Sequence, residues 1–467
     1  MSNEKNATEL LKDELFADRR NGAAKMGAEV EKAFDYCGGY IDFMNACRTE
    51  RECAAFITAE AEKKGYAPFD KSKKYSAGDR VYFNNRGKSV VLCVFGRKPL
   101  SEGTKIVASH IDSPRLDLKP NPLYEDGELA YFKTHYYGGI KKYQWTVLPL
   151  ALHGVVMKKN GEKVTVCIGD AEGEPRFVIT DLLPHLADEQ EKRTLADGIK
   201  GEELNILIGS LPLKDGEGGD LVKLAIMKII NEKYGIVEDD FMTAELEAVP
   251  AYPACDLGFD RSLIGAYGHD DRVCAYPAFT SLFDAEAPEY TGIAVLTDKE
   301  ETGSDGVTGL NSAYLKHFIY DIAETQGLNG RDVIRKCECL SADVNAGFDP
   351  VFPSVHDKYN AAYLNKGIVL TKYTGSRGKG GTSDANAEFL GKVTKIFNDA
   401  CVLWQTGELG KVDEGGGGTV AKYLANTGIE VVDVGVPMLC MHAPFEVAAK
   451  IDIYSAYKGF KAFFEQK

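Results

Sequence analysis

The sequence predicts an α/β protein in which a mostly parallel central sheet is flanked by helices and interrupted by an inserted β-rich domain. Short apolar runs that suit buried strands alternate with helical patterns in the second half of the chain, and this alternation favours parallel strands covered on both faces. Hairpin signals replace that pattern in the middle of the chain. The length of 467 residues, at about 150 residues per domain, allows two or three domains.

Helices are expected at the start, because residues 1 to 65 carry apolar side chains at helical spacing. Two β-rich runs follow, from Ser89 to Phe95 and from Lys105 to Ala108. Further buried runs extend from Glu338 to Asn345 and from Ile429 to Gly435, with helical patterns between them. The strands of the central sheet are therefore expected to come from distant parts of the chain.

The sequence pattern in the middle of the chain is typical of a separate domain. Asn160-Gly161 joins two alternating runs in the manner of a hairpin, and Leu221 to Tyr234 has a helical pattern. We therefore predict an inserted β-rich domain of residues 118–245 within a discontinuous domain made of residues 1–117 and 246–467.

The composition argues against several classes of protein. A net charge of -15 disfavours a nucleic-acid partner, which needs basic patches. The longest apolar runs are far too short to cross a bilayer, so no membrane span is expected. No apolar segment follows Met1, which makes a cytoplasmic location the expectation. The eleven cysteines are scattered without a CxxC pair, so we expect reduced thiols and no thiolate zinc site.

The adjacent carboxylates Glu300 and Glu301 follow the apolar run from Thr291 to Leu296. Ligands bind at the C-terminal ends of strands in open α/β sheets, and two carboxylates there can divide the work of holding a metal and moving a proton. An isolated pair of this kind is more often a solvated acidic turn. The functional interpretation therefore depends on partners elsewhere in the chain.

Four more candidate ligands stand at the ends of predicted strands: His110, Asp270, Asp343 and His442. Imidazole and carboxylate ligands suit zinc, or less tightly cobalt or manganese. With Glu301 they form the ligand set of a hydrolytic site with two metal ions about 3.5–4 Å apart. Asp112 lies two residues after His110, on the same side of an extended backbone, where it can orient the imidazole.

From about Tyr75 onward the sequence resembles the aspartyl aminopeptidase family of dinuclear zinc exopeptidases, in its bacterial branch. The resemblance implies a discontinuous zinc-exopeptidase domain with an inserted dimerisation domain, and two zinc ions per subunit. It is carried by these segments: His110 to Arg115, Gly268 to Arg272, Asp298 to Gly303, Ser341 to Asp343, Gly415 to Thr419, and Met441-His442.

The resemblance also implies roles for single residues. Glu300 would be the general base, Asp112 would orient His110, and Asp271 would orient the active-site loop. Whether Asp270 or its neighbour bridges the two metals stays open at this point. The implied ligands are His110 and Asp343 at one ion, Glu301 and His442 at the other, and Asp270 between them.

Substrate selection and assembly are further implications of the resemblance. Lys372 would hold the acidic side chain of the substrate, and Gly417 and Gly418 would line the cleft; a solvated surface lysine and a mobile glycine loop are the ordinary alternatives. Arg377 and Lys379 are additional candidates for binding an anion. His185 would reach the active site of a neighbouring subunit and stabilise the oxyanion there, within a tetrahedral dodecamer built from dimers.

The predicted function is therefore a cytoplasmic metalloaminopeptidase that removes N-terminal residues, preferably Asp or Glu, from peptides. One alternative is an aminopeptidase with the same metal centre that prefers neutral or hydrophobic N-terminal residues. A second is an inactive, metal-stabilised assembly or cargo protein, against which the complete ligand set and Glu300 argue.

Overall fold

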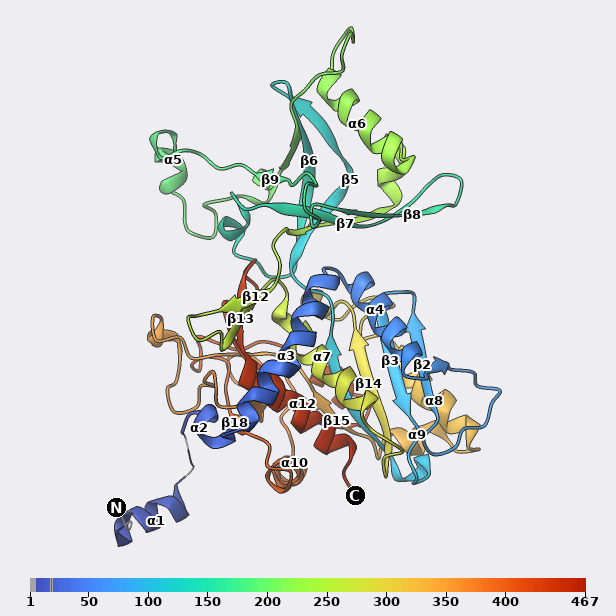
Figure 1. Ribbon diagram of the computed structural model, residues 1–467, viewed down its shortest axis with the longest axis vertical. Coiled ribbons are helices and arrows are strands. Elements are labelled where there is room, and N and C mark those ends of the chain that lie inside the picture. Colours follow the sequence, from blue (N-terminus) through green and yellow to red (C-terminus); the bar gives the residue numbers. More distant parts are fainter. Residues whose placement is uncertain (1–5, 17, 19) are drawn as a thin grey trace.

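The structure is a computed structural model that describes residues 6–16, 18 and 20–467. The predicted cytoplasmic location depends on the segment that follows Met1, and residues 1–5 of that segment lie outside the described residues. The chain forms two lobes, with the small lobe above the large one in Figure 1. Within the described ranges, no helix is long and apolar enough to cross a membrane.

A nine-stranded sheet forms the centre of the large lobe. Its middle strands β14, β4, β15 and β19 run parallel to one another, whereas β3 and β17 pair with this block in the antiparallel sense. The predicted α/β class with a mostly parallel sheet is confirmed. In spatial order the strands are β1 (Ala67–Pro68), β2 (Arg80–Asn85), β3 (Ser89–Val94), β14 (Thr291–Thr297), β4 (Thr104–His110), β15 (Glu338–Ser341), β19 (Glu430–Gly435), β17 (Ile368–Thr371) and β18 (Trp404–Thr406).

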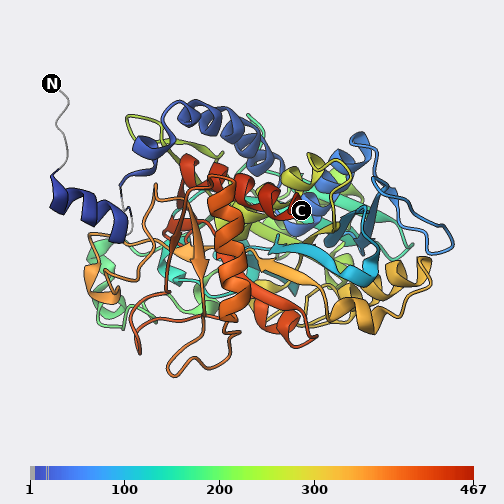
Figure 2. The same cartoon turned by 90° about the horizontal axis from the view of Figure 1, so that it is seen from below.

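Helices cover both faces of this sheet, because alternate side chains of its buried strands point to opposite sides. On β3, Leu92 and Val94 join one apolar core, while Val91 and Cys93 join the other. Figure 2 shows α10 and α12 together on one side of the sheet. The first core contains residues of α3 (Glu29–Ala46), α4 (Glu50–Lys63), α7 (His269–Phe283), α10 (Ala387–Asp399) and α12 (Lys450–Phe464), and the second those of α8 (Tyr314–Thr325), α9 (Gly330–Ile334) and α11 (Ala421–Ala425).

A seven-stranded antiparallel sheet forms the small lobe and has its own apolar core. Its strands extend from Arg115 to Pro250, and the division at residues 118 and 245 stays a prediction. Helix α6 (Leu221–Tyr234) packs on this sheet, at the helical pattern seen in the sequence. The strands are β8 (Lys163–Ile168), β7 (Leu150–Met157), β11 (Ala244–Pro250), β5 (Arg115–Asp126), β6 (Leu129–Tyr137), β10 (Ile206–Gly209) and β9 (Val178–Ile179).

A five-stranded sheet adds a second layer to the large lobe beside the central sheet. It was not separated from the central sheet by the sequence pattern, because its strands are too short to show a period. Its strands are β12 (Cys255–Leu257), β13 (Leu263–Ala266), β21 (Glu446–Ala449), β20 (Pro437–Leu439) and β16 (Asn345–Ala346).

The remaining helices are short or peripheral. Helix α1 lies apart from the large lobe in Figure 1 and in Figure 2, and none of its residues is buried. These elements are α1 (Ala7–Leu15), α2 (Gly22–Met26), α5 (Asp188–Glu191), η1 (Leu100–Glu102), η2 (Lys142–Trp145), η3 (Pro184–Leu186), η4 (Gly201–Glu203), η5 (Glu238–Thr243), η6 (Glu300–Thr302) and η7 (Pro353–Val355).

Candidate metal centre

Three neighbouring parallel strands of the central sheet end at the centre. His110 is the last residue of β4, and its backbone lies opposite Thr297 at the end of β14. Glu300 and Glu301 follow β14 in the short helix η6, and Asp343 lies just after β15. The carboxyl ends of parallel strands meet at one edge of a sheet, so these side chains converge as their positions in the sequence predict.

The other two candidate ligands come from the five-stranded sheet. Asp270 lies in the first turn of α7, just after β13, and His442 lies in the connection between β20 and β21. Both therefore follow strands, as the sequence predicts, but strands of the five-stranded sheet. The candidate ligands thus come from both sheets of the large lobe.

The candidate ligands form two groups that share Asp270. In the first group, His110 Nε2 lies 3.1 Å from Asp270 Oδ1 and 3.8 Å from Asp343 Oδ1. In the second, His442 Nε2 lies 3.2 Å from Asp270 Oδ2 and 3.6 Å from Glu301 Oε2. The two oxygens of Asp270 thus face different groups, which is the arrangement of a carboxylate between two cations.

Asp271 belongs to neither group. Its buried Oδ2 accepts a hydrogen bond of 3.2 Å from the backbone N–H of His110. The geometry therefore favours Asp270 over Asp271 as the bridging residue, and gives Asp271 the separate task of holding the end of β4.

The chemistry of the donor set fits divalent cations. Asp270 Oδ1 and Glu301 Oε1 are buried without a hydrogen-bond partner. Burial, followed by repulsion from neighbouring carboxylates, raises the pKa of Glu301 and of Asp343 well above the usual range. Buried carboxylates of this kind are stabilised by a cation, and a set of imidazole nitrogens and carboxylate oxygens suits zinc.

Glu300 lies beside the two groups and belongs to neither. Its Oε2 is 3.9 Å from His110 Nε2, which is beyond hydrogen-bond distance. Burial, together with the charges of Asp270 and Asp112, raises the pKa of Glu300 to about 7. A carboxylate with a pKa near neutrality can both accept and return a proton, which is the requirement for a general base.

Asp112 is fully buried and connects several parts of the centre. Its Oδ1 lies 3.3 Å from His110 Nδ1 and accepts the backbone N–H of Glu300 at 3.2 Å. Its Oδ2 accepts the backbone N–H of Glu301 at 3.3 Å and the hydroxyl of Tyr137 at 2.8 Å. His110 Nδ1 also lies 3.0 Å from the backbone carbonyl oxygen of Asp112, so the orientation of His110 by the Asp112 carboxylate stays a prediction. The bond from Tyr137 was not foreseen.

Glu446 is a supporting residue that the sequence reasoning missed. Its Oε1 accepts the backbone N–H of His442 at 2.7 Å, and its Oε2 accepts the backbone N–H of Asp270 at 3.2 Å. Burial and the nearby charge of Asp270 raise the pKa of Glu446 to about 8. Its position four residues after His442 was the only available signal, and it did not reveal the contact with Asp270.

A cleft of about 430 Å³ opens onto the two groups. Gly417 and Gly418 line it, as the resemblance implies. Lys372 is exposed just after β17 and is not among the residues that line the cleft. Lys422, on α11, is the single lysine or arginine of that lining among the described residues.

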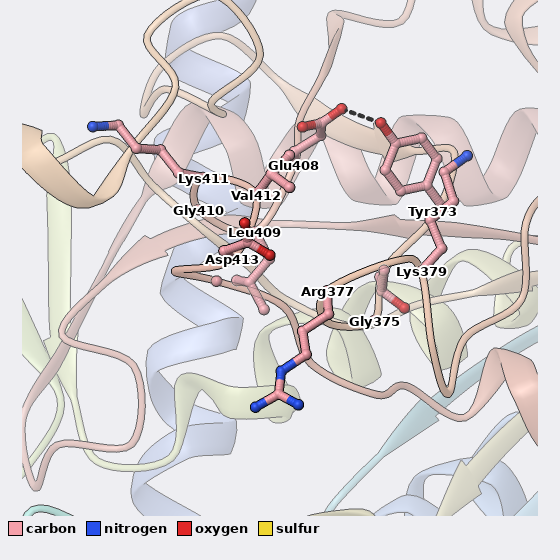
Figure 3. A pocket seen from close by; sticks show the side chains of 12 residues that line it. Tyr373, Gly375, Arg377, Lys379, Glu408, Leu409, Gly410, Lys411, Val412 and Asp413 are labelled. Atoms are coloured by element: carbon pink, nitrogen blue, oxygen red, sulfur yellow. Dashed lines mark hydrogen bonds between the residues drawn. The ribbon is translucent and has the colours of Figure 1, made fainter.

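A smaller pocket beside the cleft is lined by the loops that contain Arg377 and Lys379. Figure 3 shows the Tyr373 hydroxyl bonded to Glu408 at 2.5 Å, with the guanidinium of Arg377 pointing away from this pair. The Lys379 ammonium lies 3.7 Å from the centre of the Tyr373 ring and 2.9 Å from Asp384. Lys379 is therefore engaged within its own loop.

His185 lies in η3 of the small lobe and is exposed. It is not in either ligand group, and it does not line the cleft of its own chain. One chain therefore does not bring His185 to its own metal centre.

A third group of potential ligands, Glu52, His153 and Cys167, includes residues from both lobes. Both ring nitrogens of His153 already face carboxylates: Nδ1 lies 2.7 Å from Glu52 Oε1, and Nε2 lies 3.2 Å from Asp170 Oδ2. Burial by itself would lower the pKa of His153, but these partners raise it to about 12. Each ring nitrogen of His153 is thus paired with a carboxylate, so we interpret this group as an ion-pair network between the lobes.

Comparisons with known proteins identify the family of the chain. The family model described as aminopeptidase I zinc metalloprotease (M18) matches residues 43–464. A probable M18 family aminopeptidase 1 from Clostridium acetobutylicum is 50% identical over 443 residues, which are 93% of this chain and 95% of that protein. Its counterpart from Thermotoga maritima is 43% identical over 432 residues, which are 91% of this chain and 95% of that protein.

Solved structures give the same result. The crystal structure of the M18 aminopeptidase from Thermotoga maritima has a TM-score of 0.93 at 42% identity, covering 97% of this chain and 100% of that one. A yeast mApe1 dodecamer has a TM-score of 0.75 at 20% identity, covering 94% of this chain and 97% of that one, and so shares the fold. The chain therefore belongs to the M18 family of zinc metalloprotease aminopeptidases.

Proposed function

We propose that the chain is a dinuclear zinc aminopeptidase that hydrolyses the first peptide bond by attack of an activated water. The observation that carries this proposal is the pair of ligand groups sharing Asp270, with Glu300 beside them. When bound, two zinc ions would lower the pKa of water and polarise the scissile carbonyl. His110 and Asp343 would hold one ion, Glu301 and His442 the other.

Glu300 is proposed as the general base. Its carboxylate takes the proton of the attacking water and delivers it to the leaving amine. Its side chain lies beside both ligand groups and belongs to neither, which leaves it free to take up a proton. Asp112 keeps the backbone of Glu300 in place, because its Oδ1 accepts the Glu300 N–H at 3.2 Å. Glu301 is unsuited to this role if it is a metal ligand.

Comparing Glu300→Gln with Glu301→Gln in the full-length chain tests this division. The Glu300→Gln protein should keep the zinc content of the wild type and lose about 10²–10⁴ in kcat, the usual contribution of general acid–base catalysis. Glu301→Gln should instead lose zinc, as measured by elemental analysis. The exposed Glu388 provides the control Glu388→Gln. Retained turnover in the Glu300→Gln protein would exclude Glu300 as the general base.

We propose further that acidic N-terminal residues are preferred. Such a substrate brings a carboxylate into a cleft already lined by Asp270, Glu300, Glu301 and Asp343, so it needs a cation besides the metals. Lys372 remains the candidate that the resemblance implies. Lys422 is favoured by its position in the lining of the cleft, where its ammonium lies 5.4 Å from the centre of the Tyr423 ring.

To distinguish the two lysines, we would measure hydrolysis of Asp-, Glu- and Leu-p-nitroanilides by the Lys372→Ala and Lys422→Ala proteins. The exposed Lys316 provides the control Lys316→Ala. Loss of a charge-assisted bond of about 1.5–3 kcal/mol should lower kcat/KM roughly 10- to 150-fold for the acidic substrates only. Faster release from the Leu substrate than from the Asp and Glu substrates in the wild type would support the neutral-residue alternative, and equal rates would contradict a preference for acidic residues. No release with added zinc, cobalt or manganese would support an inactive assembly or cargo protein.

The assembly is proposed to be a homo-oligomer, and a tetrahedral dodecamer built from dimers through the small lobe. The exposed position of His185, outside its own cleft, supports its action on a neighbouring subunit. The fold shared with the yeast mApe1 dodecamer adds support. Analytical sedimentation of the purified chain measures the number of subunits in the assembly. The His185→Ala protein should lose activity but keep the same oligomeric state. A cytoplasmic location stays a prediction.

A further inference from the structure

We propose that the small lobe completes the metal centre, through three consecutive residues at the end of β6 that position ligands of both metal groups. These residues are Tyr137, Gly138 and Gly139. The inference rests on the proposed two-metal function. It assigns to the small lobe a role at the metal centre of its own chain, whereas the sequence predicted roles in assembly and, through His185, at the centre of a neighbouring subunit.

Tyr137 acts on the first group and on the general base through Asp112. Its hydroxyl donates a 2.8 Å hydrogen bond to Asp112 Oδ2, and both side chains are buried. The two oxygens of Asp112 also accept the backbone N–H groups of Glu300 and Glu301. Because one carboxylate accepts all three donors, the Tyr137 hydroxyl fixes the rotation of the Asp112 side chain, which holds the η6 backbone and lies 3.3 Å from His110 Nδ1.

Gly139 acts on the second group. Its carbonyl oxygen lies 2.7 Å from His442 Nδ1, at hydrogen-bond distance. A proton on Nδ1 that is donated to this carbonyl leaves Nε2 with a free lone pair. Nε2 is the atom that faces Asp270 and Glu301. The small lobe thereby selects the tautomer of His442 that can bind a metal.

Gly138 allows the two contacts to coexist. Its φ of +75° is in the left-handed region. A Cβ atom added there would lie 3.1 Å from Glu301 Oε2 and 3.3 Å from Glu301 Cβ. The turn after β6 therefore lies directly against a candidate metal ligand, and any side chain larger than hydrogen would press on it.

Buried charges hold this end of the small lobe against the large lobe. The Arg115 guanidinium lies 3.8 Å from the centre of the Tyr137 ring. The same guanidinium forms ion pairs of 3.2 Å with Glu247 in β11 and of 3.4 Å with Glu50 in α4. These contacts tie the tyrosine to both lobes, so the placement of the small lobe determines where the Tyr137 hydroxyl lies.

The test uses Tyr137→Phe in the full-length chain, with Tyr136→Phe as the matched control. Tyr136 is its exposed neighbour on β6 and makes no hydrogen bond through its hydroxyl among the described residues. Zinc affinity is measured by competition with a chelating dye, and the Co²⁺-substituted proteins are compared by visible absorption. Loss of a residue that orients metal ligands lowers affinity about 10- to 100-fold.

We expect Tyr137→Phe to lose zinc affinity by that factor, to change the Co²⁺ spectrum, and at saturating zinc to lower kcat with little change in KM. Gly138→Ala should shift the Co²⁺ spectrum further, because its methyl group presses on Glu301. Thermal melting of the zinc-free proteins checks that both variants fold. Wild-type zinc affinity and an unchanged Co²⁺ spectrum in folded Tyr137→Phe would overturn the inference alone. A wild-type chain without bound zinc would instead overturn the proposed function.

Discussion

Glu446 provides a sharp test of how the metal centre is built, because one side chain holds the backbone of two candidate ligands from different elements. Its two oxygens accept the N–H groups of His442 and Asp270 at 2.7 and 3.2 Å. In Glu446→Gln only one oxygen remains, and the amide N–H₂ faces a buried backbone donor. Above its pKa of about 8, where Glu446 is ionised, the loss of one charge-assisted bond of this kind amounts to about 1.5–3 kcal/mol, so the measurements are made at pH ~9.

That loss predicts two measurable effects. The free energy of unfolding of the zinc-free chain should fall by about 1.5–3 kcal/mol in urea denaturation, since the broken bond lies in the interior. Zinc affinity should fall about 10- to 100-fold, because Asp270 and His442 are no longer pre-positioned. The exposed Glu388→Gln serves as control for both measurements. Wild-type zinc affinity in a destabilised Glu446→Gln protein would refute the link between Glu446 and the ligands.

Three further predictions follow from the structure. Zinc affinity should rise with pH above the ordinary carboxyl range near about 4, because the raised pKa values of Glu301 and Asp343 require protons to leave before zinc binds; calorimetry that finds no proton release would contradict this. The raised pKa of His153, about 12, makes its ion pairs fully stabilising below pH ~6.5 and progressively weaker up to about pH 12. The melting difference between wild type and His153→Gln should therefore shrink at alkaline pH, and a constant difference would exclude a charge effect. Gly435→Ala would place a Cβ 1.6 Å from the Asp343 carbonyl oxygen, so it should destabilise the chain by more than about 3 kcal/mol, whereas Gly378→Ala, with open space around it, should not.

The sequence was sufficient to predict that the candidate ligands at the end of the central sheet lie close together. His110, Glu301 and Asp343 follow buried apolar runs, and in parallel strands such positions converge at one edge. It was also sufficient to identify the small lobe as β-rich, because hairpin signals are local. It did not separate the five-stranded sheet from the central one, since strands as short as β16 (Asn345–Ala346) have no readable period.

The hydrogen bonds that hold the candidate ligands in place could not be predicted from the sequence. Tyr137 meets Asp112 across a lobe boundary, and Glu446 meets Asp270 across 176 residues of chain. Nothing in the local pattern around either residue distinguishes it from an ordinary buried tyrosine or glutamate. Lys372 illustrates the same limit: a motif position selected it, whereas the fold brings Lys422 into the cleft.

The sequence by itself determined which side chains can bind metal and that most of them stand at strand ends, because residue chemistry and strand periodicity are properties of short segments. The tertiary structure alone decided that Asp270 faces both groups while Asp271 holds a backbone N–H. It also decided that the turn after β6 lies against Glu301 and His442. The physical reason is that hydrogen-bond partners are chosen by how separate sheets pack, and that packing sums many weak contacts between distant segments.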